Sequence, residues 1–270
     1  MATVKTRDGT TLYVKDWGHG RPVVLVHGWP LNADSWDDQA LALANAGHRV
    51  IFYDRRGFGR SDQPWSGYDY DTLADDLADV IAATGAENPA LVGFSMGGGE
   101  VARFLSRHGG ARAAALIASV VPFMLKTDDN PDGVPGEEFD KIKSGLKADR
   151  PKFLAGFLKD FYGVGLVSKP VSDEVVAASL QVALQAGLKG TLDCVDAFGR
   201  TDFRADLAAF TMPTLVLHGT ADKTVPIAIS GRAAARGIPG SKLIEIDGPH
   251  GLLATHKDEV GKALVDFLAR

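Results

Sequence analysis

The 270-residue sequence predicts an α/β protein with a doubly wound, mostly parallel sheet and an inserted helical lid. Two observations predict this fold class. Short apolar runs that end at turn residues alternate along the chain with amphipathic stretches, which is typical of buried parallel strands joined by crossover helices. In addition, residues 123–204 show helical patterns and no good strand, which indicates helices inserted between two strands of the sheet.

The expected strands are short, apolar and often β-branched. The chain opens with an antiparallel hairpin around Asp8 and Gly9, formed by the segments near Val4 and 12–14. Later apolar runs end at a glycine, an aspartate or a serine, where a strand would give way to a loop. These runs predict parallel strands over 23–26, 50–53, 90–93, 116–121, 214–217 and 243–246.

The expected helices follow from apolar residues spaced three and four apart. This spacing predicts helices over 73–81, 101–108 and 260–268, and two more over 153–161 and 175–184, with Pro151 in the first turn of the former. We therefore expect a core formed by residues 1–122 and 205–270, and a lid formed by residues 123–204. The alternative is that the inserted helices are ordinary crossovers of the same sheet, although one crossover needs only about a dozen residues.

The composition excludes several classes of protein. The net charge is −5 and no basic block interrupts the chain, which argues against nucleic acid or a membrane surface as the partner. The longest apolar runs are much shorter than the ~20 residues that cross a bilayer, and the first residues lack the apolar core of a signal peptide. Cys194 is the only cysteine, which excludes an intrachain disulfide and a thiolate metal cage. We expect a cytoplasmic protein without a metal or another cofactor.

The segment Gly93–Gly97 carries the sharpest chemical signal, the sequence Gly-Phe-Ser-Met-Gly between a predicted strand and a predicted helix. A serine at the apex of such a turn takes a strained backbone conformation, and side chains two residues to either side would collide, so both of those positions need glycine. The serine oxygen is then exposed at a helix N-terminus, where developing negative charge is stabilised. We therefore expect Ser95 to be a catalytic nucleophile.

A serine nucleophile needs a base and an orienting carboxylate. His250 follows the last predicted strand, so it should lie at the same carboxyl edge of the sheet as Ser95, and it is the expected base. Asp222 follows the penultimate strand and is the expected acid, because the chain order serine, aspartate, histidine is typical of this chemistry on such a sheet. Asp247 is the alternative acid, although an aspartate beside a turn glycine needs no functional reason.

Acyl transfer also needs N–H donors for the developing oxyanion. The expected donors are the backbone amides of Met96, directly after the nucleophile, and of Trp29, in the loop after the strand over 23–26.

Residues 54–62 form a charge-dense segment punctuated by glycines. The segment lacks the Gly-Lys-Ser or Gly-Lys-Thr sequence of a phosphate-binding loop. We therefore interpret it as a structural loop in which Asp54 and the arginines pair.

Four segments together carry a resemblance to a known family. They are His27–Pro30, the charge-dense run continuing through 63–65, the extended elbow 93–99, and 218–222. Over essentially the whole chain, the sequence resembles the bacterial arylesterases and cofactor-free haloperoxidases (perhydrolases) of the α/β-hydrolase superfamily. The Trp-Pro pair and the extended elbow are specific to this subgroup. Haloalkane dehalogenases and epoxide hydrolases look similar but carry an aspartate at the elbow, so Ser95 excludes them.

The resemblance implies a serine hydrolase that cleaves small acyl or aryl carboxylic esters through an acyl-enzyme. It further implies a peracid-forming, haloperoxidase-like side activity in which hydrogen peroxide replaces water. Ser95, Asp222 and His250 are then the triad, and Trp29 and Met96 the oxyanion donors. The alternatives are a lactone, lactam or carbon–carbon bond hydrolase, because the lid sets the substrate, and a ligand-sensing receptor on the same fold.

The expected partners are a small ester or carboxylic acid together with water or hydrogen peroxide. The sequence leaves open whether the protein forms a homo-oligomer. The lid phenylalanines are first of all core residues, and some of them are also expected to wall the acyl pocket. The pocket is expected to be lined by Pro30, Val121, Phe123, Phe139, Phe157, Phe161 and Val225.

Overall fold

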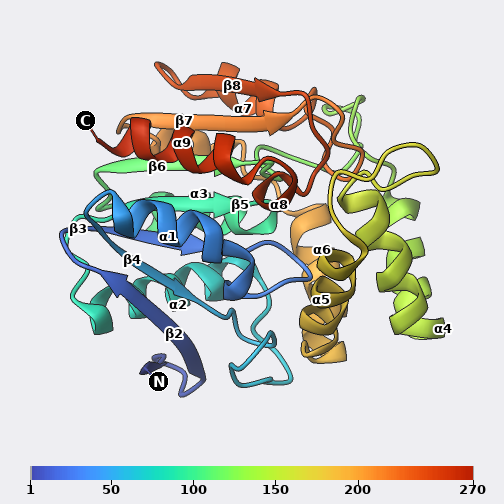
Figure 1. The fold of residues 1–270 in the computed structure, drawn as a ribbon, viewed down its shortest axis with the longest axis horizontal. Helices are drawn as coiled ribbons and strands as arrows, with labels where there is room; N and C mark the ends of the chain where they lie inside the picture. The colour runs from blue at the N-terminus through green and yellow to red at the C-terminus, as the bar shows by residue number, and fades with distance from the viewer. Residues whose placement is uncertain (1, 270) are drawn as a thin grey trace.

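A computed structural model describes residues 2–269, which form one sheet covered by helices (Figure 1). The strand order is β1-β2-β4-β3-β5-β6-β7-β8; β2 pairs antiparallel with both β1 and β4, and the other pairs are parallel. The predicted α/β fold and the predicted hairpin around Gly9 are confirmed. The strands are β1 (Ala2–Lys5), β2 (Thr11–Gly18), β3 (Arg21–Val26), β4 (His48–Tyr53), β5 (Ala90–Phe94), β6 (Ala113–Ile117), β7 (Thr214–Gly219) and β8 (Lys242–Ile246).

The structure corrects one of the predicted strands, because β6 covers Ala113–Ile117 instead of 116–121. Alanine is a weak strand former, so the run at 113–115 gave little signal, although it pairs with strands on both sides. The chain leaves the sheet at Ala118, whose φ is +44°. Val120 and Val121 are buried in the loop that follows, so their apolar character reflects burial and not strand pairing.

Helices cover both faces of the sheet, as a doubly wound fold requires. One face carries α1 (Asp37–Asn45), α8 (Leu252–Thr255) and α9 (Lys257–Leu268), and the other carries α2 (Tyr70–Thr84), α3 (Met96–Arg107) and α7 (Gly231–Gly237) (Figure 1). Successive residues of β3 alternate between the two cores: Val24 packs in one apolar cluster and Leu25 in the other. Two short 3-10 helices, η1 (Ala33–Trp36) and η2 (Ala205–Ala209), complete the connections.

Three α-helices occur between β6 and β7, before η2: α4 (Gly136–Phe161), α5 (Asp173–Leu184) and α6 (Leu188–Arg200). Figure 1 shows them together beside the carboxyl ends of the parallel strands. Helix α4 is kinked at Asp149, whose side chain accepts a hydrogen bond from the Lys152 amide at 3.0 Å and so caps a second helical segment with Pro151 in its first turn. The division of the chain into a core and a lid over 123–204 stays a prediction.

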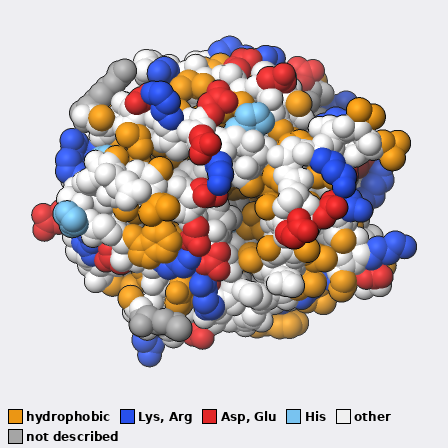
Figure 2. All heavy atoms as spheres, in the orientation of Figure 1, with side chains coloured by type: hydrophobic (Ala, Val, Ile, Leu, Met, Phe, Trp, Pro, Cys, Tyr) orange, Lys and Arg blue, Asp and Glu red, His pale blue; other side chains and the backbone are white. Residues whose placement is uncertain are grey.

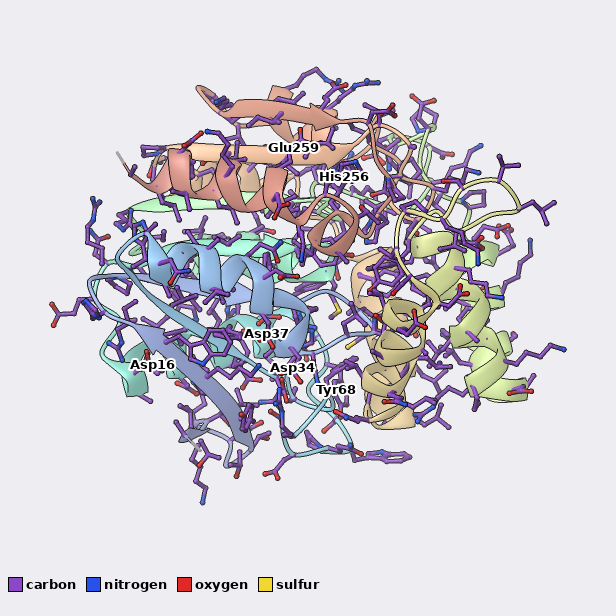
Figure 3. The ribbon with its side chains drawn as sticks, in the orientation of Figure 1. Asp16, Asp34, Asp37, Tyr68, His256 and Glu259 are labelled. Atoms are coloured by element: carbon purple, nitrogen blue, oxygen red, sulfur yellow. The ribbon has the colours of Figure 1, made fainter. Side chains whose placement is uncertain are left out.

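The three inserted helices touch the rest of the chain at a few defined points. The ring of Tyr68 packs against both Gly57 and Gly190 of α6, and Figure 3 shows Tyr68 between the sheet layer and these helices. The Gly187 amide donates to the Gly57 carbonyl at 2.8 Å. The Trp29 indole N–H donates to the carbonyl of Thr191 at 3.1 Å, so a residue of the β3 loop reaches into α6.

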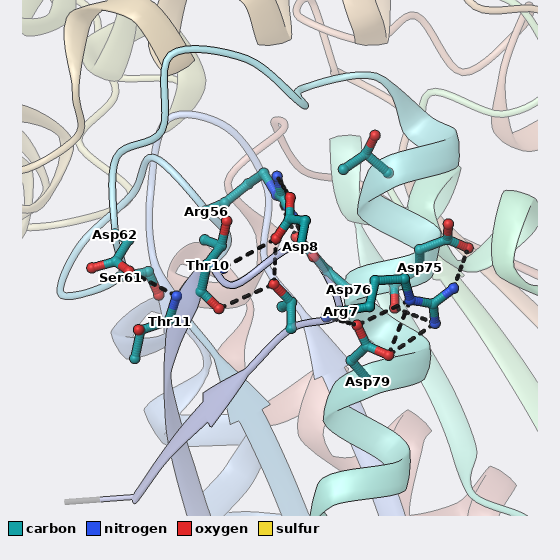
Figure 4. Close-up of polar contacts among 12 residues, drawn as sticks. Arg7, Asp8, Thr10, Thr11, Arg56, Ser61, Asp62, Asp75, Asp76 and Asp79 are labelled. Carbon is teal, nitrogen blue, oxygen red and sulfur yellow. Dashed lines mark hydrogen bonds and ion pairs between the residues drawn. The ribbon is translucent and has the colours of Figure 1, made fainter.

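The charge-dense segment 54–62 differs in part from its interpretation as a self-paired loop. Asp54 pairs with Arg60 at 2.7 Å, as expected. Arg56 instead binds Asp76 of α2 at 2.6 Å and Asp8 of the β1–β2 turn at 2.8 Å (Figure 4). The segment therefore connects separate elements of the core, because the partners of Arg56 lie 20 and 48 residues away in the sequence.

The outer surface carries mixed charge. Figure 2 shows basic and acidic side chains interspersed on one face, and among the residues described this face has no extended region of one sign. In the described part of the chain, no single helix is long and apolar enough to cross a membrane. Helices α5 and α6 reach the length and apolar composition of a membrane span only when they are taken together, and the pair is bent by 101°.

Candidate active site

Ser95 lies at the sharp turn between β5 and α3. Its backbone has φ +54° and ψ −120°, a strained conformation for a residue with a side chain. The turn is tight because Gly93 approaches the start of α3 so closely that a Cβ there would lie 2.5 Å from the Gly97 carbonyl oxygen. A Cβ on Gly97 would collide with the Val26 carbonyl oxygen of β3, so sterics require both glycines, and the serine side chain is presented at the N-terminus of α3.

The structure brings together the three residues expected to form a triad. Ser95 Oγ lies 2.9 Å from His250 Nε2, and His250 Nδ1 lies 2.6 Å from Asp222 Oδ2. Loops after β5, β7 and β8 supply the three residues at the same edge of the sheet. The alternative acid, Asp247, accepts a hydrogen bond from the Thr220 hydroxyl at 3.4 Å and makes no described contact with the imidazole.

Asp222 is buried and receives hydrogen bonds on both carboxylate oxygens. The amides of Thr224 and Val225 donate to Oδ1 at 2.9 and 2.8 Å. Burial raises the pKa of Asp222, but the two histidines beside it, His250 and His218, together lower that pKa by a larger amount. The pKa of Asp222 therefore lies well below its ordinary value. The carboxylate therefore stays ionised and can hold the His250 N–H in one orientation.

The amides expected to bind an oxyanion border the serine. A Cβ at Gly28 would lie 2.9 Å from Ser95 Cβ, so the backbone leading into Trp29 runs directly past the nucleophile. The hydrogen bonds described for residues 2–269 leave the Trp29 and Met96 amides without an acceptor. The Met96 amide also belongs to the first turn of α3, whose dipole favours negative charge.

Sequence reasoning missed a fully buried ion pair behind this loop. Arg55 Nε lies 2.8 Å from Glu100 Oε2, and both side chains are 0% exposed. Arg55 also donates to the His27 carbonyl at 2.6 Å and, through its amide, to His27 Nε2 at 2.9 Å. Burial lowers the pKa of Arg55, but Glu100 together with Cys194 and Tyr53 raises that pKa by more, so it lies above its ordinary value. The pair thus joins α3 to the loop that carries Trp29.

Replacing Glu100 by glutamine is expected to lower the free energy of unfolding by about 3–5 kcal/mol, because Arg55 would keep a buried charge without its partner. Urea denaturation of the variant and the wild type measures the difference. Asp266→Asn is the matched control, because its pair with Lys262 is exposed and should contribute about 1 kcal/mol or less. Equal losses in the two variants would contradict a special role for the buried pair.

A cavity of about 390 Å³ opens beside Ser95. Trp29, Val120, Val225 and Pro226 line its core side, and exposed charged side chains such as Lys223 stand at its edge. The remaining apolar walls come from the segment between β6 and β7 and comprise Met124, Val134, Phe139, Ile142, Phe157 and Phe198. The site is therefore a mostly apolar chamber with a nucleophile in its wall, as small-molecule sites commonly are.

Three of the expected pocket residues, Phe139, Phe157 and Val225, line this cavity, and four do not. Val120 and Met124 line it in place of their neighbours Val121 and Phe123, because adjacent residues of this loop face different ways. The Phe123 ring instead packs under the Arg204 guanidinium, 5.0 Å from it.

The other two residues lie behind the cavity wall. Pro30 is buried next to Trp29, which faces the cavity. Phe161 packs on His250, with ring centroids 4.9 Å apart, and borders a separate hollow of about 290 Å³ together with Phe94. Two aromatic rings thus hold the imidazole from behind, since Phe94 also lies 5.2 Å from it.

The described residues 2–269 contain no group of three or more histidine, cysteine, aspartate or glutamate side chains that could hold a metal ion. Cys194 is buried, and burial raises the pKa of its thiol to about 12.

Comparisons with known proteins agree with this geometry. Residues 21–257 match the family model described as the alpha/beta hydrolase fold. The chain is 48% identical to a putative non-heme chloroperoxidase of Synechocystis sp., over 95% of this chain and 94% of that one. It is 40% identical to the bifunctional esterase/perhydrolase DCH of Acinetobacter calcoaceticus, over 99% of each chain.

Among solved structures, the crystal structure of a bromoperoxidase from Bacillus anthracis superposes with a TM-score of 0.96. It is 45% identical, and the match covers 100% of this chain and 99% of the other. The match to the family model, the sheet order and the serine at the β5–α3 turn lead to one conclusion: the chain belongs to the α/β-hydrolase fold family.

Proposed function

We propose that the protein is a serine hydrolase of small acyl or aryl carboxylic esters, with a peracid-forming side activity. The observation that carries this proposal is the continuous chain of contacts from Ser95 through His250 to Asp222, which opens on an apolar cavity. The relatives support it, since one of them is named as a bifunctional esterase/perhydrolase and another as a putative non-heme chloroperoxidase.

In the proposed reaction, Ser95 Oγ attacks the ester carbonyl while His250 Nε2 takes its proton. Asp222 accepts the hydrogen bond from His250 Nδ1, which fixes the tautomer and stabilises the imidazolium. The amides of Trp29 and Met96 bind the oxyanion. The alcohol leaves with the proton from His250, and the acyl group stays on the serine.

Water or hydrogen peroxide then resolves the acyl-enzyme. His250 removes a proton from the attacking oxygen and returns it to Ser95 as the acyl–oxygen bond breaks. Water releases a carboxylic acid and peroxide releases a peracid, which then oxidises halide outside the site. Apart from the substrate and the attacking water or peroxide, the groups of this scheme are side chains and amides of the chain.

A substrate screen tests the proposal. The wild type is assayed with chromogenic aryl esters, with lactones, and with carboxylic acid plus hydrogen peroxide. We expect turnover of short-chain aryl esters and peracid formation from the acid. Turnover of lactones alone would favour the alternative hydrolase class, and binding without turnover of any substrate would favour a ligand sensor.

Ester hydrolysis is expected to decline on the acid side through a single ionisation. His250 must be neutral to accept the Ser95 proton, so its protonation stops the reaction. Asp222 adds no second step above pH 5, because its pKa lies below the ordinary aspartate value of about 3.9. Single-turnover acylation measured between pH 5 and 8 checks this, and a flat profile would contradict a histidine base.

Replacing Pro30 by leucine is expected to lower the ratio of peracid formation to ester hydrolysis about fivefold, the effect of one hydrogen bond of about 1 kcal/mol. Proline lacks an N–H and restricts the backbone of Trp29. This restriction would aim the Trp29 carbonyl at the distal O–H of hydrogen peroxide. Both rates are measured in one preparation, and a parallel fall in the two would mean that Pro30 only stiffens the loop.

A further inference from the structure

A second histidine contacts the carboxylate of Asp222. His218, the penultimate residue of β7, places Nε2 3.3 Å from Asp222 Oδ2 and 2.9 Å from the Val225 carbonyl oxygen. His218 is 0% exposed. Asp222 Oδ2 therefore lies between two imidazoles, His250 on the side of the nucleophile and His218 on the side of the sheet.

The hydrogen-bond partners determine the tautomer of His218. A carbonyl oxygen can only accept, so Nε2 must carry the hydrogen that faces Val225. Nδ1 is buried with no partner in the described part of the chain, and a Cβ on Gly231 would lie 2.6 Å from it. A hydrogen on Nδ1 would be buried and unpaired, so the ring is the Nε2–H form.

We propose that His218 is a positioning residue for the hydrolytic reaction, because its Nε2–H holds Asp222 Oδ2 in the orientation that receives His250. This inference rests on the proposed function. The turn from Asp222 to Val225 is closed from both sides: the Thr224 and Val225 amides fix Oδ1, and His218 bridges Oδ2 and the Val225 carbonyl. The single Nε2 hydrogen of His218 is shared between the Val225 carbonyl oxygen, at 2.9 Å, and the remaining acceptor position of the carboxylate, at 3.3 Å.

Loss of this donor has two expected consequences. Asp222 becomes less well oriented, so proton transfer through His250 slows while substrate binding changes less. Oδ2 also keeps more negative charge for His250, which favours the imidazolium and moves the acid limb of the rate profile to higher pH. A residue that only filled space behind the loop would change the stability of the protein and leave the acid limb in place.

Charged and aromatic side chains from several elements surround the two imidazoles. Glu245 of β8 lies beside His218 and is paired with Arg232 of α7 at 2.7 Å. Phe94 and Phe161 pack on His250 and carry no charge. Lys223 stands at the exposed edge of the cavity. A substitution at position 218 leaves these groups in place and removes one minor influence on Glu245, whose pKa is lowered first by Arg232 and also by His218.

The test compares His218→Met, which keeps much of the bulk and loses the donor, with His218→Gln, whose side-chain amide N–H can replace Nε2–H. For aryl ester hydrolysis by His218→Met, we expect kcat to fall about tenfold with a smaller change in KM. The midpoint of the acid limb should rise by about half a pH unit, as loss of one weak hydrogen bond predicts. His218→Gln should keep the midpoint of the wild type and recover most of kcat.

Two outcomes would overturn the proposal: an acid limb of His218→Met that coincides with the wild type, or equal shifts in both variants. An inactive wild type would refute the proposed function instead, so the two failures are distinguishable. If His218→Met does not fold, ¹⁵N NMR of the histidine-labelled wild type at pH 8 decides. It should show a protonated Nε2 and a bare Nδ1 for His218, assigned by the signal missing in His218→Gln, and the opposite tautomer would refute the bridge.

Discussion

Replacing Ser95 by alanine is expected to reduce ester hydrolysis by about 10⁴-fold or more while the protein stays folded. The variant removes the hydroxyl oxygen that lies 2.9 Å from His250 Nε2 at the edge of the cavity. The backbone at this position has φ +54°, which costs alanine about as much as serine, so the turn should persist. The measurement is the initial rate with a chromogenic aryl ester, together with circular dichroism and urea denaturation.

Ser144→Ala is the matched control for this substitution. Ser144 is an exposed residue of α4 that does not line the cavity, and its hydroxyl donates to the Asp140 carbonyl. The control should hydrolyse the ester at the rate of the wild type. If Ser95→Ala kept more than about one per cent of the activity, an acyl-enzyme on Ser95 would be ruled out.

Asp222→Asn is expected to slow turnover by up to about 10⁴-fold, because an amide at this position favours the wrong tautomer of His250. The carboxylate is 2.6 Å from His250 Nδ1, so the amide would meet the imidazole directly. Asp247→Asn makes the same chemical change three residues before His250 and serves as the control. It should have little effect, since the only side-chain contact described for Asp247 is with Thr220.

The steady-state rates of the two variants decide between the two carboxylates. A large loss in Asp247→Asn with little loss in Asp222→Asn would mean that Asp247 orients the base in solution. A comparable loss in both variants would indicate damage to the loops and not to one hydrogen bond, and thermal unfolding of each variant would reveal it.

Local rules made much of the fold predictable from sequence. At the Ser95 turn, a Cβ on Gly93 would collide with the Gly97 carbonyl a few residues away, so this glycine follows from a local rule. The positions of Asp222 and His250 followed from topology, because the carboxyl ends of parallel strands meet at one edge of a sheet.

The parts that sequence could not predict depend on distant contacts or on the direction of single side chains. Arg55 and Glu100 are 45 residues apart, so nothing local indicates their pairing. The pocket residues were missed by one position at Val121 and Phe123, because the loop after Ala118 is irregular and has no period. Nothing local in the sequence indicates that His218 bridges Asp222 and Val225, and only the structure shows it.

Trp29 links the backbone that is expected to bind the oxyanion to the aromatic wall of the cavity. Its amide borders the nucleophile, while its indole donates to the Thr191 carbonyl and packs on Phe157 and Phe198 at centroid distances of 5.1 and 5.6 Å. Enlarging the chamber by mutating those phenylalanines, or grafting α4–α6 from another hydrolase, would also disturb the backbone expected to bind the oxyanion. Variants selected for bulkier esters should therefore lose speed on small ones, and compensating mutations should arise near residues 28–30.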